Sequence, residues 1–148
     1  EKLNFIGVDT CEEFVNICLS KNLNCILSDM CSLPFKKDSF DAILCIASFH
    51  HLASRERRIN SLLEMHSILK PSGKILLSVW SKNQPKKTKR VFNEYGDNIV
   101  KWNKDGKIYD RFYYIFKKDE LEELFLSCNF KIDSHVWDCG NEVYTLIK

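Results

Sequence analysis

The stretch Phe40-Asp-Ala-Ile-Leu-Cys-Ile-Ala-Ser-Phe49 is the most apolar part of the chain and decides the fold. Such a continuous apolar run predicts a strand of a parallel sheet that is buried on both faces. Ser54 and the apolar spacing after it predict a helix from about Arg55 to Leu69, with Ser54 as its N-cap. Lys74 to Trp80 again has the composition of a strand. A strand, a helix and a second strand in this order indicate a parallel pair joined by a right-handed crossover.

The residues before this stretch show the same order of elements. Leu3 to Val8 and Leu23 to Leu27 are short apolar runs that predict two strands. Thr10, with Glu13 three residues later, has the pattern of a capping box and predicts a helix to about Lys21. The apolar face of this helix is expected at Phe14, Ile17 and Cys18.

The last part of the chain has a different pattern. Lys82 to Asp110 shows no sustained period and predicts an irregular excursion. Lys117 to Cys128 predicts a helix. Phe130 to Val136 and Glu142 to Ile147 predict an antiparallel hairpin with a loop of about three to five residues around Asp138–Asn141. The order of elements therefore predicts an α/β fold with a mostly parallel sheet and a C-terminal antiparallel hairpin.

Length and composition fit one ordinary globular domain, residues 1–148. The hydrophobic fraction of 45% and charged fraction of 28% are typical of a folded protein. No apolar run approaches the about 18 residues that span a bilayer, so we expect no membrane segment. Seven cysteines without a CxxC pair predict reduced, mostly structural thiols and no zinc site.

The net charge of +2 hides an uneven distribution. Residues 82–118 hold eleven Lys and Arg against four Asp and Glu. This basic segment is either a footprint for a polyanion or a solvated surface loop. Its densest run contains Lys82, Lys86, Lys87, Lys89 and Arg90.

Polar residues follow three of the expected parallel strands. In open parallel sheets, ligands bind beyond the carboxyl ends of the strands. A carboxylate such as Asp9 can accept hydrogen bonds from both hydroxyls of a ribose. Asp29 could accept from an adenine amino group while Met30 covers the ring, although each aspartate alone is more often a cap or turn residue. Together they favour a nucleoside cofactor.

The five glycines are never closer than ten residues apart, so the chain holds no glycine-rich phosphate loop. A nucleotide-binding sheet normally begins with a strand and such a loop. We therefore expect this leading strand and its loop upstream of Glu1, which makes the domain N-terminally incomplete.

Several motifs resemble a known enzyme family. Three of them are similar to middle motifs of class I S-adenosylmethionine-dependent methyltransferases: Asp29–Phe35, Phe40–Ala47 and Leu69–Lys74. Ile46-Ala-Ser-Phe-His-His-Leu-Ala-Ser-Arg-Glu-Arg-Arg58 is more specific and resembles the eukaryotic tRNA methyltransferases that esterify 5-carboxymethyluridine at the wobble position. Later signatures of that family are matched by Val79–Ser81, Arg111–Leu124 and Asp138–Asn141.

The resemblance implies a Rossmann-like class I methyltransferase sheet without its first strand, and S-adenosylmethionine as the methyl donor. The residues that it implies at the cofactor are Asp9, Thr10, Asp29, Met30 and Ile46.

The implied reaction transfers a methyl group to a carboxylate oxygen. A carboxylic acid with a pKa of about 4 is ionised at pH 7, so positioning matters more than a general base. The fork of the Arg111 guanidinium suits a carboxylate, and the alternative for Arg111 is a surface ion pair with Asp110 or Asp119. At least one of His50 and His51 is expected at the substrate, although a histidine at such a turn is often structural.

The resemblance also implies contacts with other molecules. Tyr113 and Asn141 are expected to contact the base, whereas Trp80 and Trp102 are expected in the core. The basic run from Lys82 to Arg90 is expected on the tRNA backbone at the anticodon loop. A small zinc-binding activator protein is expected along the strand edge Leu23–Leu27. The expected location is the cytoplasm, with the nucleus as a second location.

Two alternatives stay open at this point. One is a class I methyltransferase that acts on a small molecule, which the basic segment disfavours. The other is a non-catalytic, methyltransferase-like RNA-binding subunit, which the missing glycine-rich loop favours.

Overall fold

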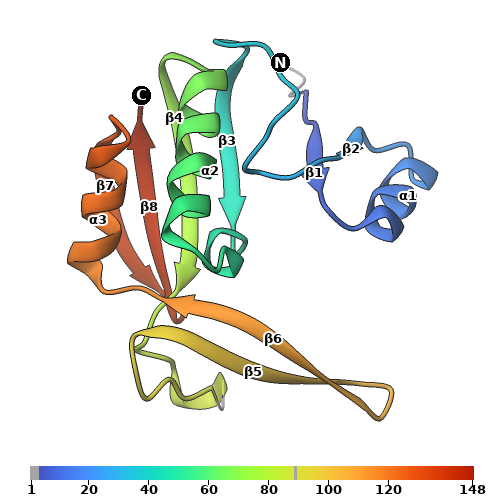
Figure 1. The fold of residues 1–148 in the computed structure, drawn as a ribbon, viewed down its shortest axis with the longest axis vertical. Coiled ribbons are helices and arrows are strands. Elements are labelled where there is room, and N and C mark those ends of the chain that lie inside the picture. The colour runs from blue at the N-terminus through green and yellow to red at the C-terminus, as the bar shows by residue number, and fades with distance from the viewer. Residues whose placement is uncertain (1–3, 89) are drawn as a thin grey trace.

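The computed structural model describes residues 4–88 and 90–148, and its strands form three separate sheets (Figure 1). Its helices and strands, in chain order, are β1 (Gly7–Asp9), α1 (Glu12–Ser20), β2 (Cys25–Leu27), β3 (Phe40–Ile46), α2 (Arg55–Ile68), β4 (Leu69–Trp80), β5 (Gly96–Lys104), β6 (Lys107–Ile115), α3 (Lys118–Ser127), β7 (Lys131–Asp138) and β8 (Asn141–Ile147). None of the described helices is long and apolar enough to cross a membrane.

The main sheet has the strand order β3-β4-β8-β7. β3 and β4 are parallel and are joined by α2, while β8 runs antiparallel to both β4 and β7. This arrangement confirms the predicted crossover and the predicted C-terminal hairpin. Ser54 caps α2 as expected, because its hydroxyl accepts a hydrogen bond from the Arg57 N–H at 3.2 Å.

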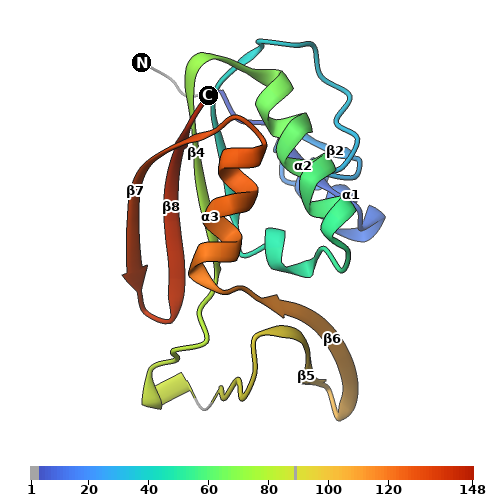
Figure 2. The same ribbon diagram turned by 60° about the vertical axis from the view of Figure 1, so that its left-hand side comes forward.

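The core lies between one face of this sheet and the helices α2 and α3, as Figure 2 shows. Leu62 and Met65 of α2 and Leu124 of α3 pack against strand residues such as Leu77 and Tyr144. Leu63, which the helical spacing places in the same stripe, is instead exposed.

The strands β1 and β2 form a separate parallel pair. Within residues 4–88 and 90–148, no strand pairs with the remaining edge of β1 or of β3. The two groups of strands are therefore separate sheets among the described residues, and the expected leading strand between them stays a prediction.

The predicted start of α1 is wrong. Its N-cap is Cys11 rather than Thr10, and no side chain of the cap accepts a hydrogen bond. Instead the Asp9 carboxylate accepts a hydrogen bond from the Cys11 N–H at 2.8 Å. This bond forms a turn before the helix, which begins one residue later than predicted. The predicted apolar face is also wrong, since Phe14 and Ile17 are exposed and Val15 is the buried residue of the helix.

The irregular excursion predicted for Lys82–Asp110 is in large part a regular hairpin, β5–β6. Its two-residue turn is Asp105-Gly106, with φ of 52° and 79°. Asp-Gly is a strong signal for such a turn, and the sequence interpretation missed it. The turn between β7 and β8 is likewise tighter than predicted, because Asp138 pairs directly with Asn141 across Cys139-Gly140.

Gly140 provides a stability test of this second turn. Its φ is +88°, and an added Cβ would lie 2.7 Å from Gln84 Oε1 and 2.8 Å from Pro85 Cδ. Gly106 has a similar φ of +79° but nothing within 4 Å of such a Cβ. We expect Gly106→Ala to lower the free energy of unfolding by about 1 kcal/mol, the cost of the left-handed conformation.

For Gly140→Ala we expect about 2–3 kcal/mol, because the contacts with Gln84 and Pro85 add to that cost. Gln84 cannot move freely, since its Nε2 donates to the carbonyl oxygens of Ser81 and Gly140. Urea unfolding of both variants measures the difference. Equal losses in the two variants would contradict the role of this close approach.

Candidate active site

The candidate site lies beyond the carboxyl ends of β3 and β4. β3 ends at Ile46, and the chain then turns through a short 3₁₀ segment, Phe49–His51. Ala47 has a positive φ of 51°, and its N–H donates to the carbonyl oxygen of Ser78 at 3.0 Å. This link ties the end of β3 to β4 and directs the next residues toward Trp80.

His50 is fully buried at this position. Its Nδ1 accepts a hydrogen bond from the Trp80 N–H at 2.9 Å, so in the neutral ring the proton is on Nε2. Burial, together with the neighbouring His51, lowers the pKa of His50 to about 3, and the ring is therefore neutral at physiological pH. Nε2 has no hydrogen-bond partner among the described residues. His50 thus holds one buried N–H donor that has no partner among the described residues.

His51 has the opposite tautomer. Its Nδ1 lies 2.8 Å from the Phe112 carbonyl oxygen and donates to it, which leaves Nε2 as an acceptor. Burial lowers the pKa of His51 as well. The sequence does not distinguish the two histidines, but the structure does. A carboxylate is attracted by the Nε2–H of His50 and repelled by the lone pair of His51.

The strand β6 brings Tyr113 and Arg111 to the histidines. The Tyr113 ring stacks on Trp80 with a centroid distance of 4.1 Å and an interplanar angle of 6°. The same ring lies 5.0 Å from the His50 ring and 4.4 Å from the His51 ring. Tyr113 is therefore buried within the site, as a wall of it rather than as a free base-binding side chain.

Two guanidinium groups lie against this stacked pair. Arg111 Cζ is 5.6 Å from the centroid of Tyr113, and Arg90 Cζ is 4.2 Å from that of Trp80. Arg111 forms no ion pair within the described residues, so the alternative of a surface pair with Asp110 or Asp119 is not observed. Both guanidinium groups lower the pKa of Tyr113, against the larger effect of burial, which raises it.

Asn141 reaches the same edge of the sheet. It pairs with Trp80 across β4 and β8 and donates from Nδ2 to the Asp138 carbonyl oxygen at 3.2 Å.

The candidate cofactor residues lie on the other side of the split. Asp9 pairs with Leu27, so Asp9 and Asp29 follow the same edge of the β1–β2 pair. Both aspartates fix their own turns, because Asp9 Oδ1 accepts from the Cys11 N–H and Asp29 Oδ1 from the Cys31 N–H. The second oxygen of Asp29 bonds the Arg57 guanidinium at 2.7 Å, and this contact lowers the Asp29 pKa. Among the described contacts Asp9 uses only Oδ1, which leaves Oδ2 for a ligand hydroxyl.

The other three residues of this set have simple environments. Met30 packs against the main core, Thr10 is exposed, and Ile46 is half exposed on the open face of β3.

The described residues of the basic run do not form one cluster at the site. The Lys82 Nζ lies 4.6 Å from the Tyr95 ring, and Arg90 rests on Trp80. Lys86 and Lys87 are exposed in a 3₁₀ turn, and Lys89 lies outside the described residues.

One tryptophan differs from the sequence interpretation, and one contact was missed. Trp80 is partly buried and packs against the small core cluster of Phe92, Tyr113 and Ile115, as expected. Trp102 is 44% exposed, so the expectation that it belongs to the core is wrong. Arg57, which anchors Asp29, is 28 residues away in the chain, and no local pattern links the two.

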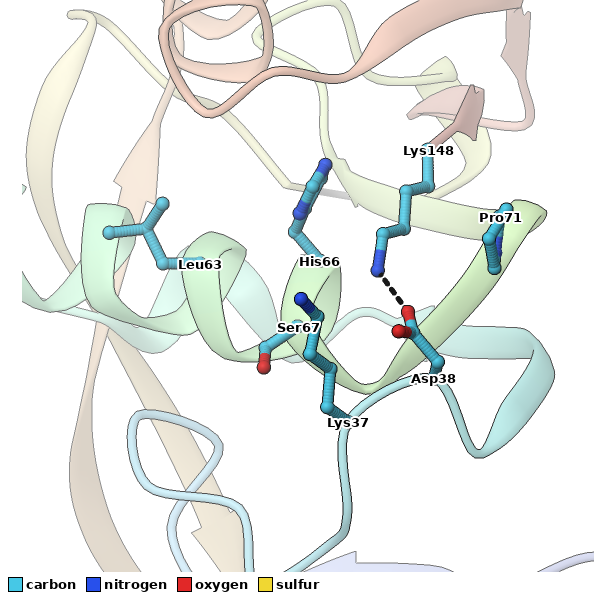
Figure 3. A pocket seen from close by; sticks show the side chains of 7 residues that line it. All are labelled: Lys37, Asp38, Leu63, His66, Ser67, Pro71 and Lys148. Atoms are coloured by element: carbon cyan, nitrogen blue, oxygen red, sulfur yellow. Dashed lines mark hydrogen bonds and ion pairs between the residues drawn. The ribbon is translucent and has the colours of Figure 1, made fainter.

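A cavity of about 450 Å³ lies at the opposite end of the sheet (Figure 3). Its lining includes Asp38, just before β3, and Lys148, just after β8. Lys148 Nζ bonds Asp38 Oδ1 and the Leu69 carbonyl oxygen, both at 2.6 Å. The Lys148 ammonium group is thus already bonded within the chain. This cavity is separate from the site at His50 and His51.

Comparison with known proteins agrees with this geometry. Residues 2–77 match the family described as a methyltransferase domain. The protein named "Probable tRNA methyltransferase 9B" from Bos taurus is 34% identical over 103 residues, which are 70% of this chain and 22% of that protein. The tRNA (carboxymethyluridine(34)-5-O)-methyltransferase alkbh8 of Xenopus tropicalis is 36% identical over 105 residues, 71% of this chain and 15% of that protein.

The match thus spans only 15–22% of the length of these relatives, which confirm the resemblance stated from the motifs. The crystal structure of an S-adenosylmethionine-dependent methyltransferase from Methanosarcina mazei has a TM-score of 0.79 at 19% identity, and the match covers 97% of this chain and 81% of that one. The chain therefore belongs to the methyltransferase domain family, and its fold is that of S-adenosylmethionine-dependent methyltransferases.

Proposed function

We propose that the protein transfers the methyl group of S-adenosylmethionine to the carboxylate of 5-carboxymethyluridine at the wobble position of tRNA. The printed name of the Xenopus tropicalis relative supports this substrate. The observation that carries the proposal is the Trp80–Tyr113 stack, against which Arg90, Arg111 and the His50 ring all lie. These groups together suit an anion that must be held without being protonated.

The residues of β1 and β2 fit the methyl donor. The free Oδ2 of Asp9 can accept from a ribose hydroxyl, and Asp29 and Met30 follow the neighbouring strand. When bound there, S-adenosylmethionine supplies a methyl group on a sulfonium, which leaves as a neutral thioether.

The chain itself has to orient the carboxylate. The substrate is already ionised at pH 7, so no proton has to be removed. The Arg111 fork binds one edge of the carboxylate, and one oxygen keeps a lone pair for the attack on the methyl carbon. The Trp80–Tyr113 stack excludes water from one side.

A carboxamide tests this proposal. A tRNA that carries 5-carbamoylmethyluridine has the same shape at the reacting group but no charge. We expect methyl transfer to the acid and none above background to the amide. Equal rates on both tRNAs would contradict carboxylate recognition, and transfer to neither would contradict the proposed substrate.

The exposed lysines give a second test. We expect the double change Lys86→Ala and Lys87→Ala to weaken tRNA binding and to reduce its salt dependence, by about 0.7–0.9 in the slope of log K against log salt for each lost phosphate contact. Binding titrations at several salt concentrations measure the slope. Lys118→Ala, in α3, is the control, and an unchanged slope in the double variant would count against this assignment.

We also propose that a small zinc-binding activator pairs with the free edge of β2. This edge is shorter than the predicted Leu23–Leu27, because β2 contains only Cys25–Leu27. Leu23 and Leu27 are exposed, and an apolar strand edge favours association. If the purified protein is soluble and fully active alone, an obligate activator is excluded.

A further inference from the structure

The β5–β6 hairpin pairs with no other strand of the described chain and extends away from the main sheet (Figure 1). Its base is anchored by the buried side chains of Phe92, Tyr113 and Ile115. Its outer half is exposed on both faces. An arm whose outer half projects from a candidate active site without packing on the body is typical of a binding surface.

The pairing register defines the two faces of this arm. Trp102 pairs with Tyr109, and Lys104 pairs with Lys107. Because directly paired residues and every second residue along a strand share a face, one side of the arm carries one continuous set of side chains. We call this side the aromatic face; it contains Trp102, Lys104, Lys107, Tyr109, Arg111 and Tyr113.

Charge is separated between the two faces. The aromatic face carries three cations and no acid along β5 and β6. The opposite face carries Asp97 and Asp110 with a single cation, Lys101, which pairs with Asp110. The basic character of this segment is therefore concentrated on the face that leads to the histidine site.

The aromatic rings on this face are accessible. Trp102 is 44% and Tyr109 is 46% exposed, and their ring centroids lie 5.9 Å apart. Lys104 Nζ is 5.8 Å from the Trp102 ring. Exposed rings beside cations form the arrangement that binds single-stranded nucleic acid, because bases stack on the rings while cations neutralise the phosphates.

The face is continuous with the candidate site. Arg111 Cζ lies 5.6 Å from both Trp102 and Tyr113, and so it connects the outer rings to the stack on Trp80. Tyr109 is four residues from Tyr113, about 13 Å along an extended strand. The outer rings are therefore in reach of nucleotides that flank the target, not of the target base.

We propose that the aromatic face of β5–β6 binds a single-stranded RNA segment next to the nucleotide that is methylated. A flanking base stacks on Trp102 and Tyr109, and Lys104 and Lys107 contact phosphates. This inference deepens the proposed function and rests on it for the identity of the RNA.

Binding of a uridine-rich single-stranded RNA of about ten nucleotides tests the face without catalysis. We expect Trp102→Ala to raise the Kd about tenfold, within the range of about 5- to 150-fold that loss of one stacked base produces. Trp102→Phe keeps a stacking ring and should stay within about threefold of the wild type. Ile108→Ala, 64% exposed on the opposite face, is the matched control and should bind as the wild type does.

Several results would overturn the proposal. These are an unchanged Kd for Trp102→Ala, an equal loss for Ile108→Ala, and no RNA binding by a wild type that instead captures a protein through this face.

A second measurement separates this inference from the proposed function. On tRNA that carries 5-carboxymethyluridine, Trp102→Ala should raise KM about tenfold, and Trp102→Phe, which keeps a stacking ring, should restore KM to within about threefold of the wild type. If Trp102→Ala methylates tRNA like the wild type, the proposal that the arm binds RNA is wrong, and the proposed methyl transfer is unaffected. If the wild type does not methylate this tRNA, the proposed function is wrong, and the RNA titration alone decides whether the arm binds RNA.

Discussion

Arg111→Ala should lower kcat/KM for methyl transfer to the carboxylate by about 100- to 1000-fold. The expected loss is that of a preorganised charged donor at a reacting group. Arg111 is exposed and has no ion pair within the described part of the chain, so its removal leaves no buried group unpaired. The variant should therefore keep the thermal stability of the wild type.

Arg111→Lys separates charge from geometry. Lysine keeps the positive charge but not the fork that binds both oxygens of a carboxylate. We expect about a tenfold loss for this variant, between the wild type and Arg111→Ala. Lys101→Ala, on the opposite face of the same hairpin, is the control for a general effect of charge. An Arg111→Ala enzyme with nearly the wild-type kcat/KM would contradict the role of this residue.

The second large effect is a loss of stability in acid through His50. In the folded protein the pKa of His50 is about 3, whereas an unfolded histidine has a pKa of about 6.5. Between these two pKa values, the unfolded state therefore binds a proton at this residue that the folded state does not bind. Stability from this residue is present above pH 6.5 and is lost as the pH falls toward 3. The expected loss between pH 7 and pH 5 is about 2 kcal/mol.

His50→Asn isolates this contribution. Asparagine Oδ1 can still accept from the Trp80 N–H, but the side chain does not titrate. Burial also lowers the pKa of His51 and His66, so part of the acid sensitivity remains in the variant. Chemical unfolding at pH 7 and pH 5 should show about 2 kcal/mol less acid destabilisation in His50→Asn than in the wild type. The same acid loss in both proteins would exclude a neutral, buried His50.

The helices and strands whose signals lie in neighbouring residues could be predicted from the sequence. The strand β3, the Ser54 cap and the helix α2 each follow from about a dozen neighbouring residues, and all three elements are present. The prediction that β3 is buried on both faces is wrong, because Cys45 and Ile43 face the core beneath the helices, whereas Leu44 is 61% and Ile46 is 50% exposed. The hairpin β5–β6 also carried a local signal, Asp105-Gly106, but its strands alternate between exposed apolar and exposed polar residues. Since neither face is buried over the outer half, no hydrophobic period marked them.

The chemistry of the site could be predicted only as a set of candidates. His50 and His51 are adjacent in the chain, and their different roles follow from the Trp80 N–H and the Phe112 carbonyl, which come from distant strands. The ion pair of Asp29 with Arg57 and the stack of Tyr113 on Trp80 are likewise tertiary contacts. These contacts decide protonation and orientation, and no spacing in the sequence encodes them.

The most direct test of the proposed reaction is the chemical nature of its product. The full-length protein is incubated with methyl-labelled S-adenosylmethionine and tRNA that carries 5-carboxymethyluridine. Ester formation predicts labelled 5-methoxycarbonylmethyluridine after digestion, and the release of the label as methanol in mild base. A label that resists base, or no transfer of label to the tRNA, would contradict methylation of the wobble carboxylate.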